Sequence, residues 1–521
     1  MWITRTQTVL LCLLMILASY SHANNSTVLK SEKRLKILAI FAHLGKSHFD
    51  VFQPLLVELA RRGHDLTVIS HFPRTEKAIA EEPLPTYKDI SLLDEKLGIL
   101  VNVVDLNLIN AFSILPIPIR DLYMLYSMAG VTCEICLKNP EVKRLVDSGE
   151  KFDLLLVESF NTNCYMALVH KFNAPFIQIS THQLMPWAID DLGLSNEASY
   201  IPTMFSRLPR PMNFFQRMRN VMTIFISTMV SRTVYHWQAQ SIANKYYGPG
   251  LPDLASVTNN ASFMFVNTHY SVHGAISFPP NVIEVGGIHI SPKVKPLPAN
   301  IKKFLDEGHE GVLYFNLGSM VKTATMPKDK LNVLIKVFAS IPRKVIWKWE
   351  VNEMPELSSN VLVQKWLPQY DILNACCSNY LLGWPRSPHP SGLPHTALLK
   401  MSEIGTTSDR RSVRNSQLRN PRYSENAKKL SKAYRDRPST PLETAVWWTE
   451  YLGRGNGLPY VKSEAANMPW YQRNLIDVML ALALLALLSI YVSFRALKYI
   501  LTRLKKKQEE RNGGMSSKKR D

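Results

Sequence analysis

The chain has 521 residues, and its 61 lysines and arginines against 42 aspartates and glutamates give a formal net charge of +19. Usual domain sizes predict about two to three folding units for this length, each able to bury a core. Residues 495–521 hold ten Lys/Arg against three acidic residues and so carry +7 of the charge. Because a large part of the charge lies in this tail, composition gives no support to a nucleic-acid partner, and we expect none.

Residues 1–23 have the pattern of a signal peptide. Arg5 precedes an apolar run over Val9–Ala18, and small residues end the segment at Ser21-His22-Ala23. An N-terminal membrane anchor is the alternative, but a span takes roughly 20 apolar residues and this run is shorter. We therefore expect the mature chain to start near Asn24.

Residues 475–494 have the length and composition of a membrane-spanning helix, with no charge from Val478 to Phe494. A buried core helix would also be apolar, but the basic residues 495–521 follow at once, as expected of a cytosolic flank. The sequence therefore predicts a single-pass type I protein with a lumenal body and a cytosolic tail. Lys518 and Lys519 resemble a dilysine retrieval signal, which indicates the endoplasmic reticulum membrane.

Five cysteines remain once the signal peptide is removed, and this odd number argues against a disulfide scaffold. Cys133 and Cys136 have redox-motif spacing, but no second pair or thioredoxin pattern accompanies them, so we expect plain helix cysteines. Three Asn-x-Ser/Thr sequons offer surface glycosylation, at Asn24, Asn25 and Asn260.

Apolar runs alternate with polar loops from residue 35 onward, in the order strand, loop, helix, strand. Leu35–Phe41 is a continuous apolar run, 42–48 a polar loop, Phe52–Leu59 has helical spacing, and Asp65–Ser70 is a second strand. The pattern recurs further on, with strands predicted at Phe152–Val157 and Phe176–Ser180. This alternation predicts an open parallel sheet with helices on both faces.

A second series of the same kind begins at Gly311. It predicts strands at Val312–Asn316, Lys344–Lys348 and Val361–Gln364, with a helix over Lys328–Ala339. The proline-rich residues 289–300 before it have the composition of a linker. The sequence thus predicts an α/β protein of two Rossmann-like domains facing across a cleft, over residues 24–288 and 301–470, with ligands at the carboxyl ends of the strands.

Residues 201–237 differ from the rest because phenylalanines and methionines are interleaved with arginines. A membrane-surface helix beside the cleft would have this composition. A core helix with a solvated basic edge would have it too, and the sequence leaves both open.

Two polar side chains stand where parallel strands are predicted to end. His48 lies in the loop after the first strand, where a general base would face a cleft, and Glu158 follows the strand over 152–157. If the strands are neighbours, the carboxylate could hold the imidazole in its useful tautomer. Taken singly, His48 could be an ordinary helix N-terminal residue and Glu158 a solvated loop residue.

Several motifs occur in order along the chain, together with the anchor and the dilysine tail: Gly45-Lys-Ser-His48, Arg62-Gly63-His64, Phe315-Asn-Leu-Gly-Ser-Met320, Trp366-Leu-Pro-Gln369 and Ala445-Val-Trp-Trp448. Over about residues 35–373 and from 420 onward, the chain resembles the membrane-bound UDP-glycosyltransferases, particularly their insect branch. The resemblance implies a GT-B fold, with an acceptor domain at the N-terminus and a UDP-sugar domain at the C-terminus.

The resemblance also implies roles for the site residues. His48 falls on the family's catalytic base and Glu158 on its acidic partner. On the donor side, Ser319 matches the diphosphate-contacting serine, Trp366 the residue that stacks on uracil, and Gln369 one that hydrogen-bonds the nucleoside. Ordinary core packing is the alternative for Trp366. The family requires no metal or other cofactor, and the sequence shows no metal-ligand cluster.

Residues 374–418 depart from the family pattern. Relatives carry a Thr-His-Gly-Gly segment for the diphosphate and later a Gly-Asp-Gln segment for the sugar, and neither occurs in this shorter, proline-rich stretch. We interpret it as a shifted frame, a deletion or a wrong gene model, and expect the strands of a doubly wound domain to be missing there.

Two hypotheses about function follow. The first is an enzyme that transfers a sugar, with glucose as the expected one, from UDP-sugar to a small lipophilic acceptor. The second is a catalytically impaired homologue or a membrane protein that binds hydrophobic ligands. The sequence leaves the acceptor and any homo- or hetero-oligomer open.

Overall fold

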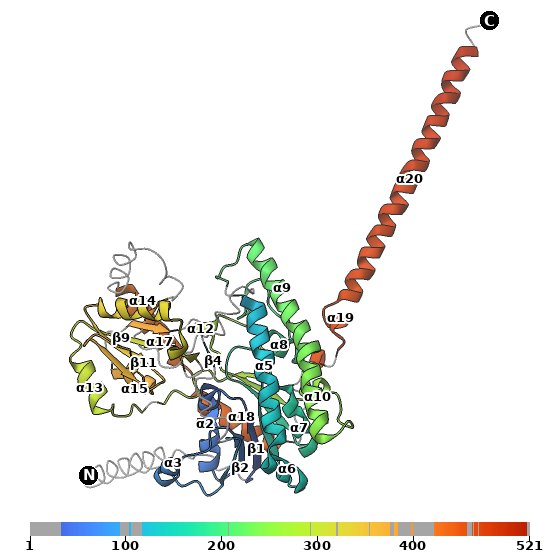
Figure 1. Ribbon diagram of the computed structural model, residues 1–521. Coiled ribbons are helices and arrows are strands. Elements are labelled where there is room, and N and C mark those ends of the chain that lie inside the picture. Colours follow the sequence, from blue (N-terminus) through green and yellow to red (C-terminus); the bar gives the residue numbers. More distant parts are fainter. Residues whose placement is uncertain are drawn as a thin grey trace, which may run out of the picture.

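The computed structural model describes residues 33–517. The exceptions are residues 94–103, 106–116, 376–379, 384–396, 400–420 and 456–460, and positions 207, 292, 319–320, 354, 462 and 467. Two α/β domains make up the body, and one long helix projects from it (Figure 1).

The N-terminal domain is built on a seven-stranded sheet with the order β3-β2-β1-β5-β6-β7-β8, and every neighbouring pair is parallel. The strands are β1 (Lys36–Phe41), β2 (Asp65–Ser70), β3 (Tyr87–Ser91), β5 (Leu154–Glu158), β6 (Phe176–Ser180), β7 (Phe263–Val266) and β8 (Val282–Glu284). The predicted β2 and β6 are confirmed at their predicted residues, and β1 and β5 within two residues.

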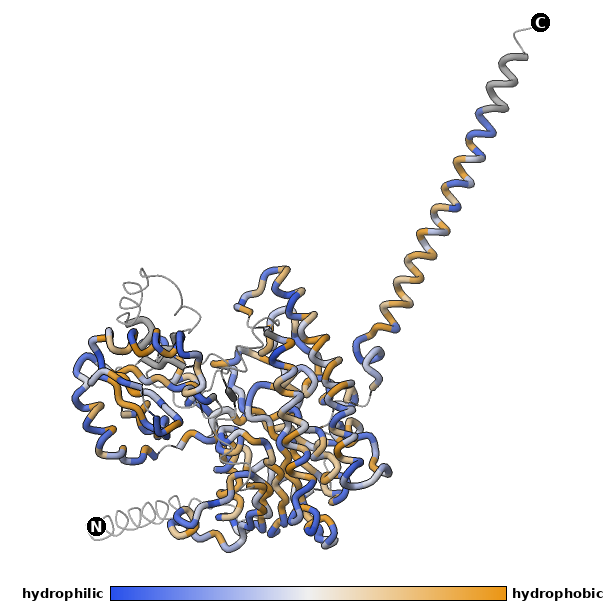
Figure 2. Tube along the Cα trace, viewed as in Figure 1, coloured by the Kyte–Doolittle hydropathy of each residue, from blue (hydrophilic) through white to orange (hydrophobic). Residues whose placement is uncertain are grey.

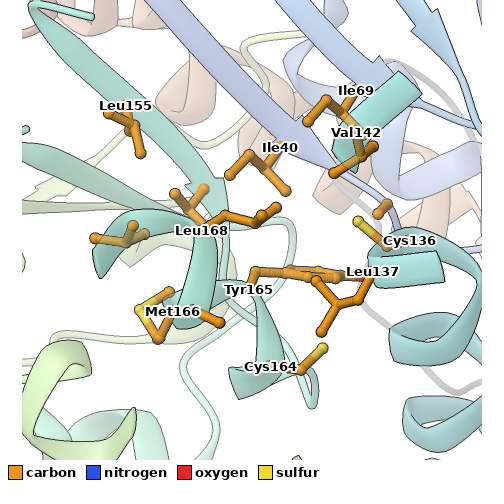
Figure 3. Packing of buried hydrophobic residues seen from close by; sticks show 14 of the residues in the cluster. Ile40, Ile69, Cys136, Leu137, Val142, Leu155, Cys164, Tyr165, Met166 and Leu168 are labelled. Atoms are coloured by element: carbon orange, nitrogen blue, oxygen red, sulfur yellow. The ribbon is translucent and has the colours of Figure 1, made fainter. Parts of the chain in front are cut away.

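Side chains of β1 alternate between two cores, because successive residues of a strand point to opposite faces of the sheet. Ile37 and Ala39 join a cluster with α2 (Lys46–Arg61). Leu38 and Ile40 join the cluster on the other face, which Figure 3 shows. The helices on that face are α5 (Ile117–Lys138), α6 (Pro140–Asp147), α7 (Met166–Phe172) and α10 (His236–Tyr247). The prediction of a parallel sheet covered on both faces is therefore confirmed.

A disulfide joins Cys133 of α5 to Cys164, in the 3-10 turn Asn163–Tyr165 before α7. The prediction of unbonded helix cysteines is wrong for Cys133. Packing of α5 against the segment after β5 brings together two residues 31 apart in sequence, which no local spacing reveals. An odd number of cysteines does not exclude a disulfide, because it requires only that one cysteine stay unpaired. Cys136 is such a free cysteine and is buried.

The C-terminal domain has a five-stranded parallel sheet with the order β12-β11-β9-β13-β14. Its strands are β9 (Val312–Asn316), β11 (Lys344–Lys348), β12 (Val361–Gln364), β13 (Tyr380–Gly383) and β14 (Ala397–Leu399), and its helices are α13 (Ala299–Asp306), α14 (Lys328–Ala339) and α15 (Gln369–Ala375). Strands β9, β11 and β12 and helix α14 occupy their predicted residues. The expectation that strands are missing from 374–418 is wrong for β13 and β14, whose short apolar runs extend the sheet beside β9.

Two helices after this domain return to the N-terminal one. Helix α17 (Pro421–Arg435) contacts α12 (Tyr270–His273), and α18 (Pro441–Arg454) packs on α2. The α18 residues Ala445, Val446 and Leu452 belong to the N-terminal core. The domain boundaries inferred from sequence therefore do not coincide with the spatial ones, because α18 is placed by its apolar face rather than by chain order.

A continuous helical rod crosses the N-terminal domain, formed by α9 (Phe214–Val230), a π-helical segment η3 (Ser231–Tyr235) and α10. Most apolar side chains of α9 are exposed, whereas Phe205, Met212 and Tyr235 elsewhere in residues 201–237 are buried. The interpretation as a core helix with a solvated edge is therefore wrong for α9.

Helix α20 (Ile476–Ser517) leaves the body after α19 (Trp470–Arg473), and its first half is mostly apolar (Figures 1 and 2). Its stretch from Ile476 to Gln508 is long and apolar enough to cross a membrane, and none of its most apolar window is buried. The predicted span 475–494 falls on this helix apart from Leu475, which precedes it.

Candidate active site

The carboxyl ends of β1, β5 and β6 lie side by side, since these strands are consecutive neighbours in the sheet. After β1 the chain adds β2 and β3 on one side of this strand, and it then adds β5 and the later strands on the other side. Ligands of open α/β sheets bind at such a switch point. His48 after β1 and Glu158 at the end of β5 meet there.

His48 occupies the first turn of α2, because the helix begins at Lys46 rather than after a loop ending at residue 48. Gly45 is the extended N-cap residue, and the backbone N–H of His48 donates to its carbonyl. The turn thereby holds the imidazole at the carboxyl end of β1. The interpretation of His48 as a helix N-terminal residue is correct for its place, but its side chain has specific partners.

His48 Nδ1 lies 2.7 Å from Glu158 Oε1 and 3.1 Å from Thr181 Oγ1, just after β6. The Glu158 side chain is only 1% exposed, so it is no solvated loop residue, whereas that of His48 is 17% exposed. A carboxylate accepts, so the proton sits on Nδ1 and the lone pair on Nε2. An oriented imidazole ring beside a buried carboxylate is the arrangement that a general base requires.

A second histidine supports the first. The ring of His43 stacks on that of His48 at 4.1 Å between centroids, and Phe160 approaches both rings edge-on. His43 is buried, and its Nδ1 accepts a hydrogen bond from the Gly45 backbone N–H. Burial lowers the pKa of His43 well below its usual value, and nearby histidines lower it further. A neutral ring can lie against His48 without opposing its protonation.

One ligand atom each from His43, His48 and Glu158 lies within 4.8 Å of the others, close enough to hold a cation. Nδ1 of His43 and Nδ1 of His48 already make the hydrogen bonds described above. The neutral His43 ring then carries its proton on Nε2, so Nε2 of His48 is the one imidazole nitrogen of the three-residue group with a free lone pair. The same three side chains have the chemistry needed for proton transfer. That the reaction requires no metal stays a prediction.

The sequence analysis missed the roles of His43, Phe160 and Thr181. Their common signal is position, since each stands within three residues of the carboxyl end of a central strand. Applying to every predicted strand end the argument used for His48 would have included them.

On the C-terminal domain, Trp366 is 52% exposed, so its interpretation as a core residue is wrong. Gln369 begins α15, and its Oε1 accepts from Asn316 Nδ2 at 3.0 Å at the end of β9. The Asn316 side chain also accepts from the backbone N–H of Gly318, whose φ is +89°. Polar groups thus gather where β9 ends.

The other predicted residues are a sequon and positions that the structure does not describe. Asn260 is an exposed turn residue, as glycosylation requires. Ser319, Asn24 and Asn25 lie outside the described residues.

The two domains also meet directly. Strand β10 (Val321–Lys322), shortly after the β9 turn, pairs in parallel with β4 (Val104–Asp105) of the N-terminal domain. Two Rossmann-like domains, one with the His48–Glu158 pair and the other with an exposed aromatic beside polar groups, form the architecture expected of a GT-B protein.

The family model described as UDP-glucoronosyl and UDP-glucosyl transferase matches residues 36–378 and 397–511, and the chain belongs to this family of transferases. UDP-glucosyltransferase 2 of Dactylopius coccus is 34% identical, over 89% of this chain and 92% of that protein. UDP-glycosyltransferase UGT5 of the same insect is 32% identical over the same shares. Human UDP-glucuronosyltransferase 2B15 is 26% identical, over 89% and 93%. The match resumes at residue 397, earlier than the predicted 420.

Proposed function

We propose that this UDP-glycosyltransferase transfers glucose with inversion to a hydroxyl of a small lipophilic acceptor. The observation that carries the proposal is the contact between His48 and Glu158. Nε2 of His48 would take the hydroxyl proton as the acceptor oxygen bonds to the anomeric carbon. The bond from that carbon to the UDP oxygen breaks on the opposite face, and UDP leaves. Glu158 would stabilise the imidazolium until the proton is released to solvent.

The donor would lie on the C-terminal domain. Trp366 offers an aromatic face for uracil, Gln369 an amide for the nucleoside, and Ser319 is assigned to the diphosphate by the family motif. Glucose is favoured because the insect relative at 34% identity is named a glucosyltransferase. UDP-sugar is then the co-substrate, and no metal or other cofactor takes part.

We place the body in the lumen of the endoplasmic reticulum, anchored as a single-pass type I protein. Three features support this proposal: the signal-peptide pattern of residues 1–23, the apolar helix α20, and the basic tail with Lys518 and Lys519.

A second candidate is a catalytically impaired homologue. Residues 379–396 are unmatched by the family model, and they directly follow the end of its first matched segment. This position corresponds to the missing diphosphate segment, and removing one preorganised donor can cost roughly 100-fold or more in rate.

Turnover of the full-length chain in microsomes separates the two candidates. With UDP-glucose and 1-naphthol we expect UDP release and a product of inverted configuration, read by NMR. His48→Ala should slow this by about 100-fold or more while UDP affinity is kept, since general bases contribute that much. His170→Ala, an exposed histidine of α7, is the matched control. UDP binding without turnover in the parent chain identifies the impaired homologue, and unchanged turnover in His48→Ala removes the base.

A further inference from the structure

The side chain of Asn316, at the end of β9, makes hydrogen bonds in three directions. Its Oδ1 accepts from the backbone N–H of Gly318 at 2.8 Å. Its Nδ2 donates to the Tyr314 hydroxyl at 2.8 Å and to Oε1 of Gln369 at 3.0 Å. One amide thus joins the turn after β9 to the first residue of α15, and both hydrogens of its NH2 group are used.

These partners fix which way two amides face. A side-chain amide can be turned over so that its oxygen and nitrogen exchange places, and its orientation follows from what surrounds it. The Gly318 backbone N–H can only donate, so the atom of Asn316 that faces it is the oxygen. Nδ2 then faces Gln369, and because Nδ2 can only donate, Gln369 must offer its oxygen. The orientation of the Gln369 amide therefore follows from one backbone N–H in the turn after β9.

The same hydrogen bonds decide what Gln369 presents to a ligand. With Oε1 held by Asn316, the NH2 group of Gln369 is directed away from that residue, and within the described part of the chain no hydrogen bond occupies it. The Gln369 side chain is partly exposed, so a ligand can reach it. A nucleoside carries oxygen acceptors on its uracil carbonyls and its ribose. The amide is therefore arranged to donate a hydrogen bond to such an oxygen.

The turn after β9 does not by itself require an amide at position 316. Gly318 has a φ of +89°, and one acceptor on the side chain two residues earlier closes the turn. A carboxylate or a hydroxyl would serve as that acceptor, as aspartate and serine do in turns of this kind. The Tyr314 hydroxyl could equally donate to a carboxylate. Only the contact with Gln369 Oε1 requires the NH2 group of Asn316.

We propose that Asn316 is a positioning residue of the donor site, which holds the Gln369 amide so that its N–H groups face the nucleoside of the UDP-sugar. The inference rests on the proposed donor site and adds the polarity of one contact. The nucleoside meets Gln369 with an oxygen that accepts a hydrogen bond. Asn316 itself need not touch the ligand, so its effect on nucleoside binding acts only through Gln369.

Asn316→Asp in the full-length chain tests the proposal, with binding of uridine and of UDP measured by ligand-detected NMR and calorimetry. The new carboxylate has nearly the shape of the amide, still accepts from Gly318, and can accept from the Tyr314 hydroxyl. It cannot donate, so Gln369 must turn its NH2 group towards it and present its oxygen outward. Uridine has no charge and so separates this change from repulsion of the diphosphate by the new carboxylate. Asn332→Asp, at an exposed asparagine of α14, is the matched control.

We expect Asn316→Asp to weaken uridine binding about tenfold, as Gln369→Ala does, and Asn332→Asp to leave it unchanged. In a Gln369→Ala background, Asn316→Asp should change uridine affinity by less than about twofold, because two substitutions that act through one contact do not add. A full loss in that background, or no loss from Asn316→Asp alone, overturns the inference and leaves the donor site standing.

Gln369→Glu gives a second test in which Asn316 is intact. Its carboxylate still accepts from Asn316 Nδ2 but presents an oxygen outward, so uridine binding should again weaken about tenfold. Unchanged uridine affinity in this variant overturns the inference, whether or not Asn316→Asp folds. Unchanged affinity in Gln369→Ala, or no UDP binding by the parent chain, refutes the donor site itself and the inference with it.

Discussion

Replacing Glu158 by glutamine tests the acid partner with the least change in shape. The amide keeps an acceptor for His48 Nδ1–H but removes the charge that faces the imidazolium. At the 2.7 Å separation of these atoms, Coulomb attraction is about 6 kcal/mol for an effective dielectric constant of about 20. His48 is partly exposed and the amide dipole replaces some of this attraction. We therefore expect a loss of roughly 3 kcal/mol, on the order of 100-fold in kcat.

The assay is single-turnover transfer from UDP-glucose to acceptors of graded hydroxyl acidity. An acidic phenol needs little help from a base, so the effect of Glu158→Gln should shrink from an aliphatic alcohol to a nitrophenol. Glu81→Gln, the same change at an exposed glutamate, should leave kcat unaltered. Equal slowing across all acceptors, or kcat for the alcohol within about threefold of the parent with folding intact, would falsify the assigned role.

Three further outcomes are expected. Trp366→Ala should weaken UDP binding about tenfold or more in calorimetry, since stacking on a base contributes roughly 1–3 kcal/mol, whereas the equally exposed Trp470→Ala should not. Burial lowers the pKa of His71 to about 4. Between pH 6.5 and 4 the unfolded chain therefore binds a proton at this residue that the folded chain does not bind. The stability that is present above pH 6.5 is lost as the pH falls towards 4. In denaturant titrations, His71→Gln should reduce that loss by about 3 kcal/mol, and an unchanged loss would contradict it. Replacing both Cys133 and Cys164 by serine removes a disulfide that links residues 31 apart in sequence, and it should lower the free energy of unfolding by about 4 kcal/mol. A change below about 1 kcal/mol would contradict this expectation.

The strands that sequence predicts well are those buried on both faces. Residues 65–70, 176–180 and 312–316 are short segments rich in apolar residues and bounded by loop residues, and such segments admit few alternatives in an α/β chain. Strand β3 escaped prediction because it lies at the sheet edge, where only Ile90 is buried. Strand β7 is fully buried but only four residues long, too short for periodicity to separate it from one turn of a buried helix.

The positions of the site residues were predictable from the sequence, but the contacts made by their supports were not. His48 and Glu158 follow from strand ends that must meet if their strands are neighbours. The stacking of His43 on His48 and the disulfide from Cys133 to Cys164 depend on three-dimensional packing between segments, and neither leaves a spacing in the sequence. Strands β13 and β14 were hidden for another reason, because their short apolar runs lie among prolines that suggest loops.

Helix α9 shows why composition alone left two interpretations of residues 201–237. Phenylalanines and polar residues alternate with helical spacing there, and the pattern is the same whichever face turns inward. Which face turns inward depends on whether the polar side chains find hydrogen-bond partners inside the protein. Asn220 finds four hydrogen bonds there, in the loop over 198–206. Burying that face therefore costs little, and the apolar face is left to whatever medium surrounds the domain. In water, an exposed apolar face of this size would favour aggregation.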